Sequence, residues 1–258
     1  MLPYSEWLEA AEALPLGRSK RIKHCNHNTT MKISHDDEGY HAYCFRCSEG
    51  GFKAHGLRRI SDVFAEREFC YAKNITLPTD FTKEVPDFAS VWYLKAGVNT
   101  EMAQGYGIGW SDKLQRVLLP VYNGDELVVV QARAVHKGQH PKYLNQQGNK
   151  KSLTLFKSHS YTGSGAVVCI TEDILSCIRV GEVVPCVCCM GTSLSDAQAG
   201  QLLGYDSVAV WLDNDQAGWK GSSKMHRKLS PVVSTRVIHA EADPKCYDNQ
   251  AIKEIING

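Results

Sequence analysis

Three cysteines and two histidines near the start of the chain have the chemistry of a metal site. Cys44 and Cys47 form a C-x-x-C pair, and two thiolates at this spacing can bind one side of a tetrahedral Zn²⁺. The other side must come from the His-Cys-Asn-His segment upstream. We expect Cys25 and His27 to complete the site, and His24 is the alternative imidazole ligand.

A second group of candidate residues consists of carboxylates that follow apolar segments. Glu172 follows Val167–Thr171, and both Asp213 and Asp215 follow Val208–Leu212. Polar groups of an open parallel sheet gather at the carboxyl ends of its strands. Hard oxygen ligands in such a cluster suit Mg²⁺ or Mn²⁺. We therefore expect Glu172, Asp213 and Asp215 to hold a divalent metal ion.

Asp243 is a further candidate Mg²⁺ ligand, because it follows the next strand expected along the chain, at 234–239. Asp173 and Asp215 also have an alternative role. Each stands just before a predicted helix, and Asp is a common N-cap whose side chain accepts hydrogen bonds from the first backbone N–H groups. Taken singly each is a candidate cap, whereas the three carboxylates after the strands together favour metal binding.

The second half of the chain alternates strand-like and helix-like segments, which is typical of a parallel α/β sheet with right-handed crossovers. We expect strands at 166–171, 183–190, 207–212 and 234–239, and helices at 173–181, 194–203, 217–229 and 249–257. Upstream, segments 116–122 and 127–134 flank an Asn-Gly-Asp-Glu turn and predict a β-hairpin. The parallel sheet supplies the strand ends at which the carboxylates must meet.

The N-terminal part has a different texture. A short helix is expected at 4–13, followed at 18–53 by short polar strands and turns that lack the apolar residues for a core. A module of this kind needs a metal to hold it together. We expect His35 and His41, on its strands, to be exposed rather than metal-binding. A further helix is expected at 59–72.

Basic charge is concentrated around the expected zinc ligands, where residues 16–59 carry nine Lys and Arg against four Asp and Glu. Tyr43 and Phe45 stand among these cations. Cations that follow phosphates and aromatic rings that stack on bases make up a single-strand DNA-binding surface. Packing of both rings in a core is the alternative.

Composition limits the class of protein. The chain has 258 residues, a formal net charge of +1 and 43% hydrophobic residues, which excludes a disordered chain. No apolar run approaches the roughly 18 residues of a membrane span, and the N-terminus lacks a signal-peptide pattern. Ten cysteines that form no evenly spread framework indicate metal binding and a reducing compartment. Those in the apolar strand at 183–190 are interpreted as buried structural thiols. We expect a soluble cytoplasmic protein.

The ordered set of motifs resembles the DNA primases of bacteria and phages, most closely the stand-alone primases of tailed phages. Besides the zinc pair, it consists of RVLLPV at 116–121, QAR at 131–133, PKYLN at 141–145, MGTSL at 190–194 and LDNDQAG at 212–218. The resemblance implies an α+β and α/β chain, with a small zinc-ribbon domain before a primase core that contains a toprim subdomain. The implied parts are a zinc-binding template-recognition domain at 1–55, a linker at 56–86, the N-terminal part of an RNA polymerase core at 87–162 and the toprim subdomain at 163–258.

The resemblance implies a DNA-directed RNA polymerase that makes short RNA primers from NTPs on a single-stranded DNA template for DNA replication. Glu172, Asp213 and Asp215 would be catalytic and would bind Mg²⁺ or Mn²⁺. The residues that would bind nucleotide and template are Arg116, Arg133 and Lys142. No G-x-x-x-x-G-K-[ST] phosphate loop occurs, so a separate replicative helicase is the expected partner. A phage-encoded chain would act in the cytoplasm of its bacterial host.

The chain departs from the family pattern after Glu172. The family's toprim glutamate is usually followed by Gly and, four residues on, by Asp, whereas here Asp173 follows and position 176 is Ser. A register with Asp173 in the later position would put a residue of the apolar strand at the glutamate position, so Glu172 is preferred. The alternative function is a non-catalytic zinc and toprim DNA-binding protein of the recombination-mediator type. The motifs at 116–121 and 141–145 favour an enzyme.

Overall fold

The computed structural model describes residues 1–25, 28–36, 38–56, 75–147 and 154–258. The chain divides into two units, Met1–Asn74 and Ile75–Gly258, which are described separately. The helix expected at 59–72 lies outside the described residues. None of the described helices has the length and apolar character needed to cross a lipid bilayer.

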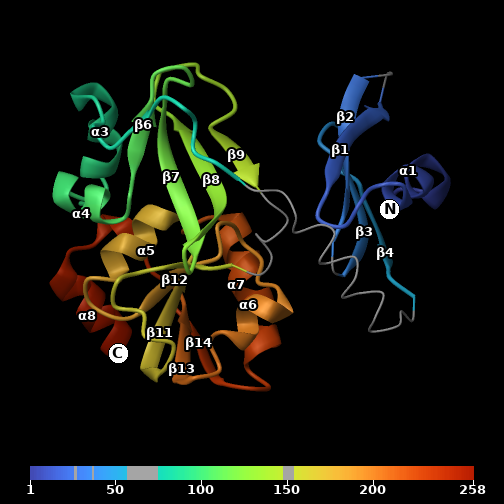
Figure 1. The fold of residues 1–258 in the computed structure, drawn as a ribbon. Helices are drawn as coiled ribbons and strands as arrows, with labels where there is room; N and C mark the ends of the chain where they lie inside the picture. The colour runs from blue at the N-terminus through green and yellow to red at the C-terminus, as the bar shows by residue number, and fades with distance from the viewer. Residues whose placement is uncertain (26–27, 37, 57–74, 148–153) are drawn as a thin grey trace. The chain divides into compact units, whose positions relative to one another are not determined.

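The first unit is a four-stranded antiparallel sheet with a short helical segment before it (Figure 1). Its strands pair in the order β1-β2-β3-β4. The elements are the 3₁₀ helix η1 (Tyr4–Glu6), α1 (Leu8–Glu12), β1 (Ser19–His24), β2 (Asn28–His35), β3 (Gly39–Cys44) and β4 (Gly50–Ala54). The expected helix at 4–13 is thus split into a 3₁₀ turn and a short α-helix.

One face of this sheet packs on the N-terminal segment. Met31, Ile33 and Ala42 alternate with exposed or half-buried residues along β2 and β3, as a sheet with one covered face requires. Trp7, 1% exposed, covers them, and a Cβ on Gly51 would lie 2.7 Å from the Trp7 ring. The unit therefore has a small apolar core, contrary to expectation, because residues before the first strand supply part of it.

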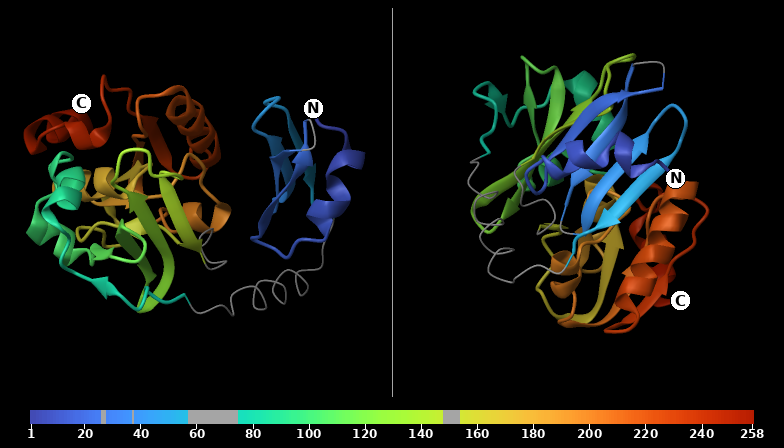
Figure 2. Two further views of the ribbon diagram at one scale, coloured as in Figure 1. Left: turned by 90° about the horizontal axis from the view of Figure 1, so that it is seen from above. Right: turned by 90° about the vertical axis from the view of Figure 1, so that its right-hand side faces the viewer.

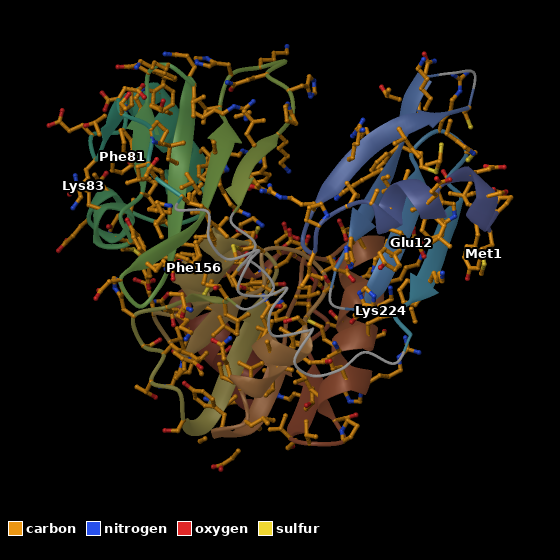
Figure 3. All side chains as sticks on the ribbon, turned by 45° about the vertical axis from the view of Figure 1, so that its right-hand side comes forward. Met1, Glu12, Phe81, Lys83, Phe156 and Lys224 are labelled. Carbon is orange, nitrogen blue, oxygen red and sulfur yellow. The ribbon has the colours of Figure 1, made fainter. Side chains whose placement is uncertain are left out.

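Polar contacts tie the same helix to the sheet. Lys53 on β4 donates to Glu12 on α1 at 2.9 Å, and Glu12 is labelled in Figure 3. The prediction that His35 is exposed is wrong: it is 6% exposed, and its Nδ1 lies 2.6 Å from the carbonyl oxygen of Leu14. His41 is half-buried and pairs with Asp36 at 2.9 Å.

The second unit contains two sheets, and the first is antiparallel in the order β5-β6-β7-β8-β9. Its strands are β5 (Phe81–Thr82), β6 (Gly109–Ser111), β7 (Arg116–Asn123), β8 (Glu126–Ala134) and β9 (Tyr143–Gln147), accompanied by helices α3 (Asp87–Leu94) and α4 (Thr100–Gly105). The expected hairpin is confirmed. Asn123 pairs with Glu126 across a two-residue turn in which Gly124 has φ +60°, a conformation that favours glycine.

The second sheet has the order β10-β12-β11-β13-β14, with β10 antiparallel to β12 and the other neighbours parallel. Its strands are β10 (Phe156–Lys157), β11 (Gly165–Thr171), β12 (Cys186–Cys188), β13 (Tyr205–Val210) and β14 (Ser234–Val237). Its helices are α5 (Ile174–Val180), α6 (Asp196–Gly200), α7 (Gln216–Leu229), the 3₁₀ helix η3 (Pro244–Cys246) and α8 (Asn249–Asn257). The predicted α/β alternation is confirmed.

Helices cover both faces of this parallel sheet (Figures 1 and 2). Cys169 and Ala209 belong to the core that includes α5 and α8, whereas Val168 and Val208 belong to the core that includes Met225 of α7. The cysteines of the strand expected at 183–190 are at most 3% exposed, which confirms them as buried thiols. Because β11 and β13 are neighbours and parallel, their carboxyl ends lie at one edge.

Candidate functional site

Four side chains at one end of the first unit have the geometry of a metal centre. The ligand atoms of His24, Cys25, Cys44 and Cys47 all lie within 4.8 Å of one another. Cys25 Sγ is 3.2 Å from His24 Nδ1 and 3.8 Å from Cys44 Sγ, and Cys47 Sγ is 3.9 Å from His24 Nδ1. In a tetrahedron with metal–sulfur bonds of about 2.3 Å, neighbouring sulfur ligands are about 3.8 Å apart. The four atoms therefore fit one tetrahedral ion.

Two turns at the same end of the antiparallel sheet position these ligands. His24 ends β1 and Cys44 ends β3, and both strands run toward this end. Cys25, directly after β1, and Ser48, in the turn after β3, have φ of 21° and 59°. In the second turn, Ser48 N–H donates to the carbonyl oxygen of Cys44. His27, the imidazole preferred from the sequence, lies outside the described residues.

The thiols differ in how readily they ionise. Burial acts to raise the pKa of Cys44, but hydrogen bonds from the backbone N–H of Cys47 and from Thr30 lower it to about 5. Burial raises the pKa of Cys25 to about 11. Cys44 is thus held as a thiolate by its own turn, whereas Cys25 needs a cation beside it to lose its proton.

His24 has a carboxylate behind it. Its Nε2 lies 3.0 Å from Oε2 of Glu6, while its Nδ1 faces Cys25 and Cys47. Metal-binding histidines commonly donate their second ring N–H to a carboxylate, which fixes the tautomer and the ring orientation. Glu6 is a residue that the sequence analysis missed, because nothing in the spacing brings residue 6 next to residue 24.

The acidic residues of the second unit meet beyond β11 and β13, as expected. Glu172 directly follows β11, and Asp213 lies three residues after β13. Glu172 Oε2 and Asp213 Oδ1 are buried, and neither has a hydrogen-bond partner among the residues that the structure describes. Burial and the neighbouring carboxylates raise the pKa of Glu172 to about 7 and that of Asp213 to about 6. Buried, mutually repelling oxygens without donors match the needs of a hard divalent cation.

Asp173 and Asp215 both act as helix caps. Asp215 Oδ1 accepts from Gly218 N–H at 2.7 Å, and Asp173 Oδ1 accepts from the backbone N–H groups of Leu175 and Ser176. Both remain part of the cluster, because their charges raise the pKa of Glu172. Asp173 and Asp215 therefore cap helices and also belong to the acidic cluster.

Lys245 joins the remaining carboxylates and is another residue that the sequence analysis did not assign. Its Nζ lies 2.9 Å from Asp173, 3.0 Å from Asp243 and 3.5 Å from Asp213. Asp243 is fixed by a second bond, from the backbone N–H of Asn214. Within the described part of the chain, no three carboxylates come as close as the thiol and imidazole ligands do. The acidic cluster is thus a looser group around a lysine.

The three basic residues predicted to bind nucleotide and template have different surroundings. Arg116 is 3% exposed and donates to the carbonyl oxygens of Ala132 and Pro141, which ties the loop before Lys142 to the hairpin. Lys142 is exposed and close enough to Asp243 to lower its pKa. These contacts give Arg116 a positioning role and leave Lys142 available at the edge of the cluster.

Arg133 stands between two aromatic rings. Its guanidinium carbon lies 5.3 Å from the centre of the Trp92 ring and 5.0 Å from that of Tyr143. Within the described part of the chain, its Nε has no hydrogen-bond partner. Burial and the charge of Asp173 raise the pKa of Tyr143, while Arg133 and Lys245 lower it. The antiparallel sheet therefore brings Arg133 and Tyr143 beside the acidic cluster. Lys224, labelled in Figure 3, is exposed on α7.

The uncovered face of the first unit carries aromatic and basic side chains. A hollow of about 530 Å³ is lined by residues that include Lys32, His41, Tyr43 and Phe52. Tyr43 and Phe52 are 44% and 43% exposed. Phe45, 55% exposed, lies beside this face with Arg21 over its ring at 5.0 Å. The alternative that Tyr43 and Phe45 pack in a core is therefore wrong.

Comparisons with known proteins agree with this architecture. Residues 169–248 match the Toprim-like family. The structure is similar to the zinc-binding and RNA polymerase domains of the Aquifex aeolicus primase, at 17% identity over 96% of this chain and 81% of that one, with a TM-score of 0.56. It is also similar to the primase fragment of the bacteriophage T7 primase-helicase protein, at 15% identity over 92% and 97%, with a TM-score of 0.50.

A third similar structure is the RNA polymerase domain of the Mycobacterium tuberculosis primase DnaG, at 17% identity over 67% of this chain and 77% of that one, with a TM-score of 0.51. A search of curated protein sequences finds no match. The chain therefore has the fold of the bacterial and phage primases, with a Toprim-like domain in its second unit, and the predicted fold class is confirmed.

Proposed function

We propose that this protein is a DNA primase that synthesises short RNA primers from NTPs on single-stranded DNA. The observation that carries the proposal is the acidic cluster at the carboxyl ends of β11 and β13, inside a primase fold that extends over 96% of the chain. Two cations support the proposal: Lys142 is close enough to Asp243 to lower its pKa, and Arg133 lies 5.0 Å from the ring of Tyr143, whose pKa the charge of Asp173 raises. Cations beside an acidic metal site can bind the negatively charged phosphates of a triphosphate substrate.

Primer synthesis joins two nucleotides when the 3′-hydroxyl of one attacks the α-phosphate of the next and pyrophosphate leaves. Mg²⁺ or Mn²⁺ bound by Glu172, Asp213 and Asp215 would lower the pKa of that hydroxyl and neutralise the developing charge. Glu172 and Asp213 each offer a buried oxygen that accepts no hydrogen bond from a described residue. Asp215 is held in place because its Oδ1 accepts from Gly218 N–H. Asp243 is the fourth acidic candidate, and it also pairs with Lys245.

The positive groups around the cluster would orient the phosphates. Arg133 is held between Trp92 and Tyr143 and retains a donor without a partner. Lys142 lies on the loop that Arg116 fixes through Pro141. In this proposal Arg133 and Lys142 contact nucleotide or template, while Arg116 positions the loop.

The first unit would bind Zn²⁺ through His24, Cys25, Cys44 and Cys47 and would read the template. Three exposed aromatic rings and two cations on or beside one sheet face support this role, because bases stack on rings while phosphates meet cations. They are Tyr43, Phe45, Phe52, Lys32 and Arg21. A zinc ion is favoured by the soft donor set and by the tetrahedral spacing.

A non-catalytic DNA-binding protein of the recombination-mediator type is the alternative. It would need neither unpartnered carboxylates at the strand ends nor Arg133 poised beside them. The enzyme is therefore the better supported function. We place it in the cytoplasm of a bacterium, or of the bacterial host of a phage, with a separate helicase as partner. The helicase partner is inferred from the T7 relative, which is a fragment of a primase-helicase protein.

The direct experiment is the incorporation of radiolabelled NTPs on random single-stranded DNA, with and without Mg²⁺. The proposal expects short RNA products that need both the template and the metal ion. DNA binding without any incorporation, in Mg²⁺ or Mn²⁺, would instead support the non-catalytic alternative.

A further inference from the structure

A lysine lies inside the cluster of carboxylates that the proposed function assigns to metal ions. The Nζ of Lys245 is within 3.5 Å of oxygens from Asp173, Asp213 and Asp243, and the side chain is 24% exposed. Surface lysines usually extend into water, where a single ion pair contributes little. Lys245 differs from such a lysine, because three carboxylates surround its ammonium much as they would surround a metal ion.

The segment that carries Lys245 is fixed to the fold. Pro244 is buried, and the carbonyl oxygen of Tyr247 accepts a hydrogen bond from Arg179 on α5. The Tyr247 hydroxyl accepts from Ala242 N–H, and its ring packs 5.6 Å from that of Trp211. Contacts on both sides therefore hold η3 in place, so the position of Lys245 belongs to the fold.

The carboxylate oxygens divide into two sets. Asp173 and Asp243 direct Oδ2 at Lys245, and their Oδ1 atoms accept backbone N–H groups of Leu175 and Asn214. In contrast, Glu172 Oε2 and Asp213 Oδ1 are buried, and no described residue donates a hydrogen bond to either atom. Asp213 contributes to both sets, because its Oδ2 lies 3.5 Å from Lys245.

We infer that the Lys245 ammonium takes the place of one divalent ion in the acidic cluster. The ammonium pairs with the carboxylates of Asp173 and Asp243. Glu172, Asp213 and Asp215 then form the remaining site for a divalent ion. The inference rests on the proposed function, since it concerns the same cluster. It assigns Lys245 as a positioning residue that limits how many metal ions the site accepts.

The physical reason is charge balance. The cluster contains five carboxylates, those of Glu172, Asp173, Asp213, Asp215 and Asp243. All five can be ionised together only when several positive charges lie beside them. A fixed ammonium supplies one charge without any metal, and it repels a divalent cation that approaches the same oxygens. Removal of that ammonium takes away the positive charge that lies against the Oδ2 atoms of Asp173 and Asp243, so that these atoms become available to a second divalent ion.

The test counts Mn²⁺ ions bound to the full-length, Zn²⁺-loaded chain by electron paramagnetic resonance of the free ion. We expect Lys245→Met to bind one more Mn²⁺ per chain than the wild type, or to bind Mn²⁺ about tenfold or more tightly. Lys113→Met is the matched control, because Lys113 is exposed in the same unit and pairs with Thr79 away from the cluster. It should bind Mn²⁺ as the wild type does.

A double variant separates charge from loosened structure. Lys245→Met with Asp243→Asn removes one positive and one negative charge, so the extra binding should disappear. If the double variant keeps the gain, the gain comes from loosening and the inference is overturned. Lys245→Gln is a second neutral variant, measured in case the methionine variant does not fold, and the same gain is expected of it.

The outcomes distinguish the inference from the proposed function. If the wild type and both neutral variants bind the same number of Mn²⁺ ions with the same affinity, the role of Lys245 is overturned and the metal site stays in place. If no form of the protein binds Mn²⁺, and Asp213→Asn makes no difference, the metal site of the proposed function fails and the inference fails with it.

Discussion

The Nε2 atom of His24 lies 3.0 Å from Oε2 of Glu6. This contact joins the first helical turn of the chain to the end of β1, and it leaves Nδ1 of His24 directed at the thiols. The imidazole is thereby fixed in the tautomer that offers Nδ1 as the ligand atom. The contact therefore explains how a histidine directly beside Cys25 can serve the same ion.

Glu6→Gln should weaken Zn²⁺ binding by about ten- to a hundredfold, since outer carboxylates of metal-binding histidines are worth about that much. Competition against a zinc chelator measures the change. Glu9→Gln is the matched control, because Glu9 is exposed on α1. Equal zinc affinities for the two variants would show that Glu6 does not support the ligand.

His24→Ala should reduce the zinc content of the purified protein far below one ion per chain, while His27→Ala should retain it. The reason is that His24 Nδ1 lies among the three thiols. Elemental analysis of both variants makes the comparison. A zinc-free His27→Ala protein beside a zinc-loaded His24→Ala protein would reverse the assignment.

Glu172→Gln should lower primer synthesis by at least about a hundredfold, because even outer partners of metal ligands are worth about ten- to a hundredfold. Asp173→Asn keeps an oxygen that can cap α5, but it loses the charge opposite Lys245 and the oxygen that accepts from the Ser176 hydroxyl. It should therefore cost about 1 kcal/mol or less of stability. NTP incorporation and thermal unfolding are measured on both variants, and an inactive Asp173→Asn beside an active Glu172→Gln would establish the other register.

The pair formed by Asp36 and His41 should make stability depend on pH. The hydrogen bond to Asp36 raises the pKa of His41 above 6.5, so the folded state binds a proton that the unfolded chain releases. That stabilisation is complete below pH 6.5 and is lost as the pH rises through the folded pKa. Since both side chains are over a third exposed, the effect is about 0.5 kcal/mol.

The measurement is the free energy of unfolding of zinc-saturated wild type and His41→Gln, as a function of pH. The difference between them should shrink as the pH rises above 6.5. A difference that grows in this range would contradict the sign of the shift.

The parallel sheet and the meeting of Glu172 with Asp213 could be predicted from the sequence. Apolar strands and helices alternate at regular spacing there, and neighbouring parallel strands place the residues that follow them at one edge. The thiol ligands were also predictable, because C-x-x-C spacing is a local property. These features depend on the periodicity of apolar residues and on the spacing of residues that are close in sequence, and both can be read directly from the sequence.

The partners of these residues could not be predicted. Lys245 and Asp173 are 72 positions apart, and a lysine side chain is usually solvated. Arg116 begins a strand, where a charged residue is normally exposed, yet it is 3% exposed because two carbonyl oxygens face it. His35 is buried for a similar reason, since the chain before β1 folds over it. Each depends on packing between distant segments.

The central claim is that the carboxylates beyond β11 and β13 catalyse RNA primer synthesis. Asp213→Asn tests it most directly, because Asp213 Oδ1 is buried without a hydrogen-bond partner in the described ranges, and Asp215 rather than Asp213 caps α7. Asp206→Asn is the control, since Asp206 is exposed near the amino end of the same strand. The measurement is NTP incorporation on single-stranded DNA in Mg²⁺, at equal DNA binding. The account predicts that Asp213→Asn loses synthesis while Asp206→Asn retains it, and near-wild-type synthesis by Asp213→Asn would contradict it.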